Sequence, residues 1–233
     1  MISIMKPIRI GIIAPSAVIP QVELGLGVER LKSENFLVRV HPQCRSRHLF
    51  FAGTDEERAQ AFWDFAKDSE IDVLWFARGG YGAARILARL EAWTRKHGKP
   101  PKKMLLGYSD ATALLEFVQT HWGWTAWHAP MPGTREFQWM SSRDWRDLMS
   151  AVRGEERVLG WENRKLKFLG KAPRTAVTGT LAGGNLTVWT TLIGTPFEPK
   201  PPGRILFLED VGEALYRIDR LLEHLMASGG LQG

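Results

Sequence analysis

Short apolar runs alternate with amphipathic segments through the first half of the chain. The runs have the length of β-strands, and they lie at 8–15, 36–42, 71–76, 104–110 and 125–130. Between them, Thr54-Asp55-Glu56-Glu57 is typical of a capping box that opens a helix to about residue 69. The segment 83–97 carries apolar residues at 86, 87, 90 and 93, which is one face of a helix. This alternation predicts a parallel sheet covered by helices.

The pattern changes in the second half of the chain. From about 133 to 176 it predicts only one short helix, around Trp145 and Leu148, and a charged stretch. Order returns at 178–196, followed by a strand at 204–210 and a helix from Glu213 to about Ser228. One strand with one or two helices cannot bury both faces of a sheet. We therefore predict an N-terminal α/β domain (1–135), a linker (136–176) and an incomplete C-terminal α/β domain (177–233).

Composition narrows the class of protein. The chain has 233 residues, a net charge of +6 and a single cysteine, Cys44, which excludes a disulfide scaffold. No apolar run reaches the roughly 18 residues of a membrane span, and the first residues are too charged, and their apolar part too short, for us to expect a secretory signal. Basic residues in 143–174 are mixed with acids rather than focused on one face, so we expect no nucleic-acid partner and no membrane partner. These features predict a cytoplasmic protein.

Two turns could carry chemistry, because both follow a predicted strand and precede a helix. In Gly107-Tyr108-Ser109-Asp110 a sharp turn would lift the serine hydroxyl clear of the sheet, although Ser109 or Asp110 could equally be a helix cap. Arg78-Gly79-Gly80-Tyr81-Gly82 would expose backbone N–H groups, or form a flexible turn. The carboxyl edge of an open α/β sheet is where ligands bind. We therefore expect the two turns to lie side by side, one with a nucleophile and the other with an oxyanion donor.

A carboxylate pair ends the last apolar strand. Glu209 and Asp210 follow Leu206-Phe207-Leu208, where an acid could orient a histidine or could cap a helix.

Six sequence blocks together resemble one known family. In order, they are RGGYG (78–82), GYSD (107–110), HAPMP (128–132), TLAGGNL (180–186), GTPFEP (194–199) and ILFLEDVGEALYRIDRLL (205–222). The chain is similar over nearly its whole length to the LD-carboxypeptidases, the family of serine peptidases that also includes the microcin-C-resistance proteins. The resemblance implies Ser109 as nucleophile, Glu209 as the acid of a Ser-His-Glu triad, and the N–H groups of Gly80 and Asp110 as the oxyanion hole.

The resemblance also implies a substrate. It is a small peptidoglycan-derived tetrapeptide that loses its terminal D-alanine through cleavage of an L-to-D bond, and no metal or organic cofactor is implied. We expect Arg78, Gly79, Tyr81 and His128 to contact this peptide. A homodimer is compatible with the family. Hydrolysis of a peptidyl-nucleotide amide is an alternative, for which Trp122, Trp124 and Trp127 could supply a stacking surface.

The catalytic histidine of the family is missing from the matched blocks, because it lies downstream of them. His224 has the right chain order, but about 16 Å of helix would separate it from the helix start near Glu213. We therefore expect a C-terminally truncated chain that lacks the base. A peptide-binding pseudoenzyme is the alternative from a different class. Truncation would also expose the apolar face Leu221, Leu222 and Leu225.

Overall fold

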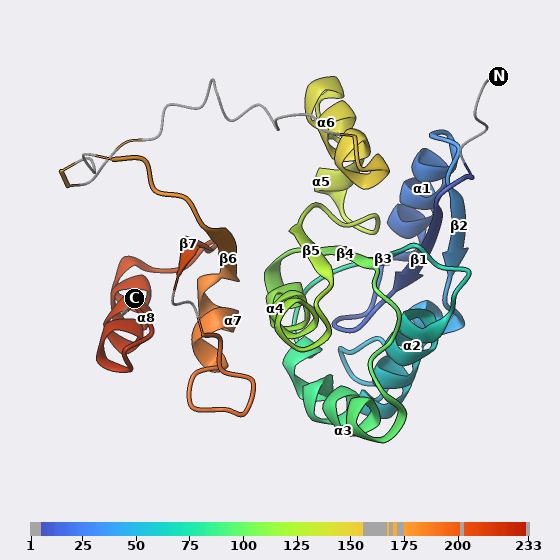
Figure 1. Cartoon of the computed structure of the whole chain (residues 1–233). Helices are drawn as coiled ribbons and strands as arrows, with labels where there is room; N and C mark the ends of the chain where they lie inside the picture. Colours follow the sequence, from blue (N-terminus) through green and yellow to red (C-terminus); the bar gives the residue numbers. More distant parts are fainter. Residues whose placement is uncertain (1–5, 156–166, 168–169, 172–174, 201–202, 232–233) are drawn as a thin grey trace.

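The protein is described by a computed structural model that covers residues 6–155, 167, 170–171, 175–200 and 203–231. Its N-terminal part is built on a five-stranded parallel sheet of order β2-β1-β3-β4-β5 (Figure 1). The strands are β1 (Arg9–Ile13), β2 (Leu37–Val40), β3 (Val73–Phe76), β4 (Met104–Gly107) and β5 (Thr125–His128). Each of the five predicted runs forms one strand. The strand order reverses between β1 and β3, and such a reversal opens a crevice at the carboxyl edge of a sheet.

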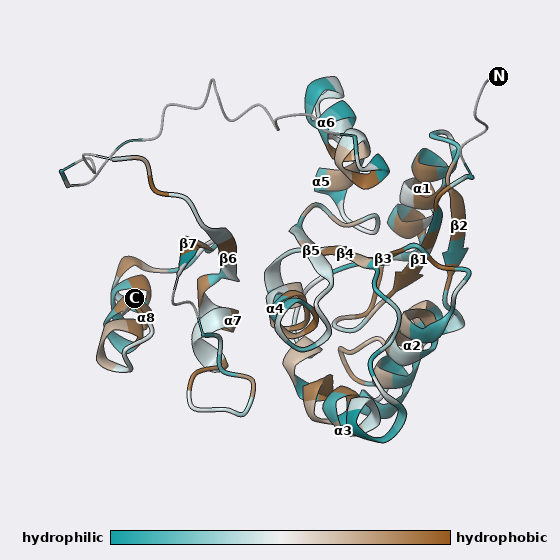
Figure 2. Cartoon of the chain, in the orientation of Figure 1, coloured by the Kyte–Doolittle hydropathy of each residue, from teal (hydrophilic) through white to brown (hydrophobic). Residues whose placement is uncertain are grey.

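The central strand β3 shows why the strands appear as uninterrupted apolar runs. All four of its residues are buried, and it pairs with β1 on one side (Ile10 opposite Val73) and with β4 on the other (Leu74 opposite Leu105). A parallel sheet covered on both faces requires apolar side chains in both directions, so period-two alternation disappears. Figure 2 shows the hydrophobic residues gathered on these strands and on the inner faces of the helices.

Helices α2 (Asp55–Lys67), α3 (Leu87–His97) and α4 (Thr112–Phe117) cover one face of the sheet. The predicted capping box is confirmed, because Thr54 and Glu57 bond each other's backbone N–H groups at the start of α2. Shorter helical turns occur at Pro42–Arg45, Ala83–Ile86, Ser109–Ala111 and Val118–Trp122.

Helices α1 (Gln21–Lys32), α5 (Arg135–Gln138) and α6 (Ser142–Arg153) lie on the opposite face. The helix expected around Trp145 is α6, whose Trp145 Nε1 donates to Glu34 at 2.7 Å from within the core of this face. The segment 136–176, predicted as a linker, thus begins with helices packed against the N-terminal sheet. Much of its remainder lies outside the described residues.

The C-terminal part is a second, smaller unit. Strands β6 (Thr180–Asn185) and β7 (Arg204–Glu209) pair in parallel, and α7 (Leu186–Thr191) and α8 (Leu215–Ala227) pack against each other. The prediction that α8 exposes the apolar face Leu221, Leu222 and Leu225 is partly wrong. Leu225 is fully buried against α7 and β6, and Leu221 packs beside it, because α8 turns this edge toward Trp189. No helix of the described residues is long and apolar enough to cross a membrane.

Candidate active site

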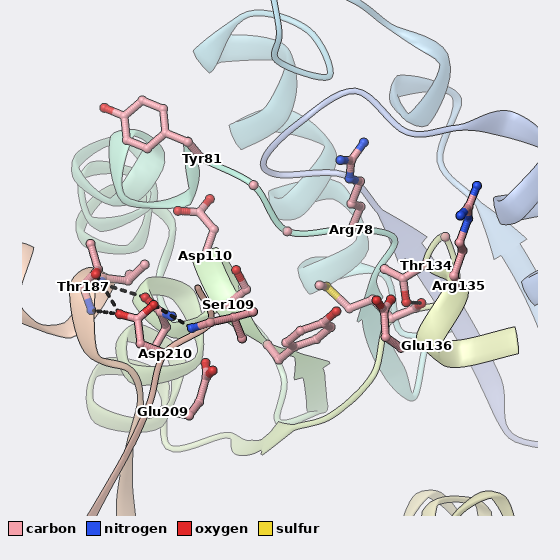
Figure 3. Close-up of a pocket in the computed structure, with 18 of the residues that line it drawn as sticks. Arg78, Tyr81, Ser109, Asp110, Thr134, Arg135, Glu136, Thr187, Glu209 and Asp210 are labelled. Atoms are coloured by element: carbon pink, nitrogen blue, oxygen red, sulfur yellow. Dashed lines mark hydrogen bonds between the residues drawn. The ribbon is translucent and has the colours of Figure 1, made fainter. Parts of the chain in front are cut away.

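A pocket of about 980 Å³ opens at the carboxyl edge of the five-stranded sheet, where β3 and β4 end. Residues of the C-terminal unit close its other side (Figure 3). Polar and charged side chains line much of it: Glu23, Arg78, Tyr81, Tyr108, Ser109, Asp110, Thr134, Arg135, Glu136, Asn185, Thr187, Thr191, Glu209, Asp210 and Glu213. The pocket therefore joins the turns that the sequence singled out.

Ser109 stands on a strained turn between β4 and α4. Its φ of +61° falls in the left-handed region, which a residue other than glycine rarely adopts. The turn needs glycine at 107, where a Cβ atom would come within 2.8 Å of Ala111 Cβ. This geometry is that of a nucleophile elbow, in which the chain reverses so tightly that the serine hydroxyl points away from the sheet.

The glycine-rich turn after β3 lies directly against this elbow. A Cβ atom on Gly79 would be 3.2 Å from Ser109 Cβ and 3.3 Å from Ser109 Oγ. Gly80 has a φ of +116°, and a Cβ atom there would come within 2.6 Å of Ala17 Cβ. Both glycines line the pocket with Ser109. The expectation that the two turns lie side by side is confirmed, because Gly79 abuts Ser109 and both turns line one pocket.

The side chain of Asp110 is hydrogen-bonded to two neighbouring loops. Its carboxylate accepts a hydrogen bond from the Ser16 hydroxyl at 2.6 Å and another from the Ala83 N–H at 2.8 Å. Burial raises the pKa of this carboxyl, and the bonds from Ser16 and Ala83 oppose the shift. The side chain thus links the elbow to two neighbouring loops.

Glu209 ends β7 and faces the pocket from the C-terminal unit (Figure 3). The Asn185 side chain hydrogen-bonds it, and His128 Nε2 lies 3.6 Å from its Oε1. Burial raises the pKa of Glu209, and the nearby Asp210 raises it further, against the lowering effect of Asn185. Burial lowers the pKa of His128, which favours the neutral ring.

Helix α4 connects the two halves of this arrangement, because it begins just after Ser109 and contacts the C-terminal unit. Thr112 Oγ1 accepts the Asn185 N–H at 3.0 Å. Glu116 is buried and pairs with Arg204 Nη2 at 2.6 Å, at the start of the strand that ends in Glu209. The same short helix that follows the elbow therefore also holds β6 and β7.

The histidines lie outside the pocket lining that the described residues form. None of them is among the pocket-lining residues of the described chain, and His224 is exposed on α8. His128 contacts Glu209, and its Nδ1 is shielded and has no hydrogen-bond partner among the described residues, so it makes no bond to Ser109. His128 therefore neighbours Glu209 without lining the pocket, and its contact with a substrate stays a prediction.

The aromatic residues offered as a stacking surface are not in the pocket. Trp122 and Trp124 belong to the buried core beneath α2 and α3, and Trp127 packs against the core of the other face. The expectation of a tryptophan stacking surface is wrong, since these rings cover the sheet. The aromatic residues that do line the pocket are Tyr81 and Tyr108.

Two residues of the site escaped the sequence analysis. Ser16 follows β1 with no motif around it, so only its partner Asp110, 94 positions away, reveals it. Asn185 lies inside the TLAGGNL block, which is a signal that could have placed it beside Glu209. Among the described residues, no group of three or more His, Cys, Asp or Glu side chains is arranged to hold a metal ion.

Comparison with known proteins decides the family. The model of the LD-carboxypeptidase N-terminal domain matches residues 10–129, and that of the LD-carboxypeptidase C-terminal domain matches residues 178–233. The chain belongs to the LD-carboxypeptidase family. This confirms the resemblance drawn from the six sequence blocks.

Two curated relatives illustrate the match. The chain is 34% identical to a putative carboxypeptidase of Rickettsia conorii, with 98% of this chain and 71% of the relative covered. It is 31% identical to the murein tetrapeptide carboxypeptidase of Pseudomonas aeruginosa, with 94% and 72% covered. Across six such relatives the chain spans 64 to 72% of their own length.

Solved structures agree on the fold. A muramoyltetrapeptide carboxypeptidase from Oxalobacter formigenes superposes with a TM-score of 0.77 at 31% identity, covering 96% of this chain and 73% of that one. The microcin C7 self-immunity protein in complex with glutamyl sulfamoyl guanosine gives a TM-score of 0.75 at 22% identity, covering 94% and 73%. The second likeness shows a shared fold.

Proposed function

We propose that this LD-carboxypeptidase hydrolyses the L-to-D peptide bond of a peptidoglycan-derived tetrapeptide and releases its terminal D-alanine. The observation that carries the proposal is Ser109 at φ +61°, in one pocket with the glycines of residues 79–80 and the carboxylate of Glu209. Relatives named for murein peptides support the choice of substrate. The reaction is proposed to take place in the cytoplasm.

In this proposal Ser109 attacks the scissile carbonyl, and the N–H groups of Gly80 and Asp110 receive the developing oxyanion. Donors fixed in advance stabilise that charge without reorganisation, which is why backbone N–H groups on tight turns suit the task. Glu209 is the acid that orients a histidine base, and its partial burial raises its pKa against the lowering effect of the bond from Asn185. Arg78, with its guanidinium anchored on the Val18 carbonyl, and Tyr81 are the proposed peptide contacts.

The decisive variant is Ser109→Ala, with Ser142→Ala on the exposed start of α6 as the matched control. In a protein that carries the complete Ser-His-Glu triad, we expect Ser109→Ala to lower D-alanine release by a factor of at least about 1,000 and Ser142→Ala to leave it unchanged, because triad members act as a unit. D-Alanine released from an L-Lys- or diaminopimelate-containing tetrapeptide is measured with D-amino-acid oxidase. Unchanged turnover in Ser109→Ala would remove the nucleophile.

A peptide-binding protein without turnover is the second candidate, favoured by the lack of a histidine among the pocket-lining residues described. The same assay separates the two when it is paired with calorimetric titration of the tetrapeptide. Binding that releases no D-alanine would support the second candidate. The nucleotide-amide alternative loses its tryptophan surface, and competition between the tetrapeptide and a peptidyl nucleotide would test what remains of it.

A further inference from the structure

Two oppositely charged side chains are buried beneath the glycine-rich turn. Arg58, on α2, has a side chain with no exposed area, and it donates to the carbonyl oxygens of Pro15 and of Gly82, the latter at 2.8 Å. Asp110, on the elbow, bonds the same two loops, but as an acceptor where Arg58 is a donor. It accepts from the Ser16 hydroxyl at 2.6 Å and from the Ala83 N–H at 2.8 Å.

These four bonds form a cross-brace between consecutive pairs of residues. Residues 15 and 16 follow β1, while Gly82 is the last residue of the glycine-rich turn and Ala83 is the residue after it. In each pair the first residue bonds Arg58 and the second bonds Asp110. Burying an ionised group is costly unless hydrogen bonds compensate for the lost water, so the bonds that Arg58 and Asp110 make favour keeping these four partners in place.

Gly80 packs against the loop after β1, and the preceding residue, Gly79, lies against Ser109. The Ala17 N–H donates to the Gly79 carbonyl at 3.3 Å, and a Cβ atom on Gly80 would collide with Ala17. The position of Gly80 is therefore set by the loop after β1, which the brace ties to the elbow. A shift of that loop would move the Gly80 N–H relative to the Ser109 hydroxyl.

We propose that the side chains of Ser16, Arg58 and Asp110 are positioning residues, which hold the Gly80 N–H opposite the Ser109 hydroxyl. The inference rests on the proposed function, because it assigns a purpose to the oxyanion hole formed there. The three side chains touch backbone and each other's loops. In this proposal these side chains do not have to touch the substrate. The backbone N–H of Asp110 is a separate group, which is proposed to contact the oxyanion.

A misplaced oxyanion donor weakens binding of the transition state and leaves binding of the ground state intact. Binding of a peptide boronic acid, which has boron in place of the scissile carbonyl carbon, measures how well the site binds the transition state. The Ser109 oxygen forms a fourth bond to the trigonal boron, the hydroxyl proton passes to solvent, and a tetrahedral anion results. The matching peptide with a free carboxylate reports ground-state binding.

The sharpest variant is Ser16→Ala, because it deletes one buried hydroxyl and leaves the chain otherwise unchanged. Ser150→Ala is its matched control, since Ser150 is also buried but lies on α6, on the other face of the sheet. Ser16→Ala should weaken the boronic acid about tenfold or more and the carboxylate peptide less than about twofold. Asp110→Asn and Arg58→Lys should likewise weaken binding of the boronic acid more than binding of the carboxylate peptide. Thermal melting verifies that each variant folds.

The outcomes are distinct. Equal weakening of both ligands by Ser16→Ala, or an effect no larger than that of Ser150→Ala, would overturn the positioning role while leaving Ser109 as nucleophile. If the unmodified chain forms no boronate adduct in ¹¹B NMR, or Ser109→Ala binds the boronic acid as tightly, the proposed function fails and the inference fails with it. A selective loss in tetrapeptide kcat at constant KM would confirm the inference during turnover.

Discussion

The two units of this chain are built from the same βα pattern but differ in how completely they are covered. In the N-terminal unit (6–155) helices pack on both faces of the sheet, and every residue of β3 is buried. In the C-terminal unit β7 has no fully buried residue, and α8 exposes Leu215, Tyr216 and Met226 at 85%, 60% and 52%. The first unit thus has a central strand covered on both faces, whereas neither strand of the second is covered in this way.

The difference shows how the site divides its tasks. Ser109 and the glycines opposite it stand on the covered sheet, whose core resists displacement. Glu209 stands on the less covered unit, and its distance from Ser109 depends on the contacts that β6, β7 and α7 make with α4. The proposed nucleophile Ser109 and the proposed acid Glu209 therefore lie on units that are covered to different extents.

The largest expected effect compares two leucines. Leu74→Ala, at the fully buried centre of β3, should lower the free energy of unfolding by roughly 3 kcal/mol, because it leaves a cavity. Leu222→Ala, on the exposed side of α8, should cost less than about 1 kcal/mol. Urea denaturation measures both. Equal losses would contradict the difference in covering between the two units.

The next effect concerns the buried ion pair between α4 and β7. Glu116→Gln leaves Arg204 without its carboxylate, and we expect a loss of about 3 kcal/mol. The double variant Glu116→Leu/Arg204→Met should recover most of it, since apolar pairs can replace buried ion pairs. Hydrogen exchange localises the loss. If exchange rose equally throughout the chain, the pair would not be specific to attachment of the C-terminal unit.

A smaller effect is expected at the contact one helical turn after Ser109. Thr112→Val removes the acceptor of the buried Asn185 N–H, which should cost about 1–2 kcal/mol and displace Glu209 through Asn185. Thr112→Ser retains the hydroxyl and is the control. Stability and D-alanine release are measured together, and identical behaviour of both variants would show that the hydroxyl is not needed.

The smallest effect is a pH dependence in the N-terminal unit. The pKa of Asp110 is raised in the folded protein because burial disfavours the charge. The folded state therefore holds this proton more tightly than the unfolded chain. The associated stability is present below the ordinary aspartate pKa of about 3.9 and is lost as the pH rises through the folded value.

Asp110→Asn should remove this contribution. As the pH is raised from acid to neutral, the unfolding free energy of the unmodified chain should fall relative to that of the variant. Urea titrations over that range measure it. A difference that stayed constant with pH would show that Asp110 does not titrate with a raised pKa.

Much of the N-terminal fold could be predicted from the sequence, since buried parallel strands leave continuous apolar runs. The runs at 71–76 and 104–110 became β3 and β4, and the turn at Ser109 was placed by its position after a strand. α6 was less visible as part of this unit, because Trp145 and Arg153 reach across to Glu34 on another segment. Long-range bonds of this kind leave no local period.

The sequence by itself determined the order of strands and helices, the family, and which turns end at the rim of the sheet, because periodicity and turn residues are local properties. Only the tertiary structure decided that Ser16 meets Asp110, that Trp122 and Trp124 fill the core instead of the pocket, and that α4 holds the strand bearing Glu209. These outcomes depend on distances between segments far apart in the chain. They are set by packing and by the bonding of buried polar groups, which act only once the sheet has formed.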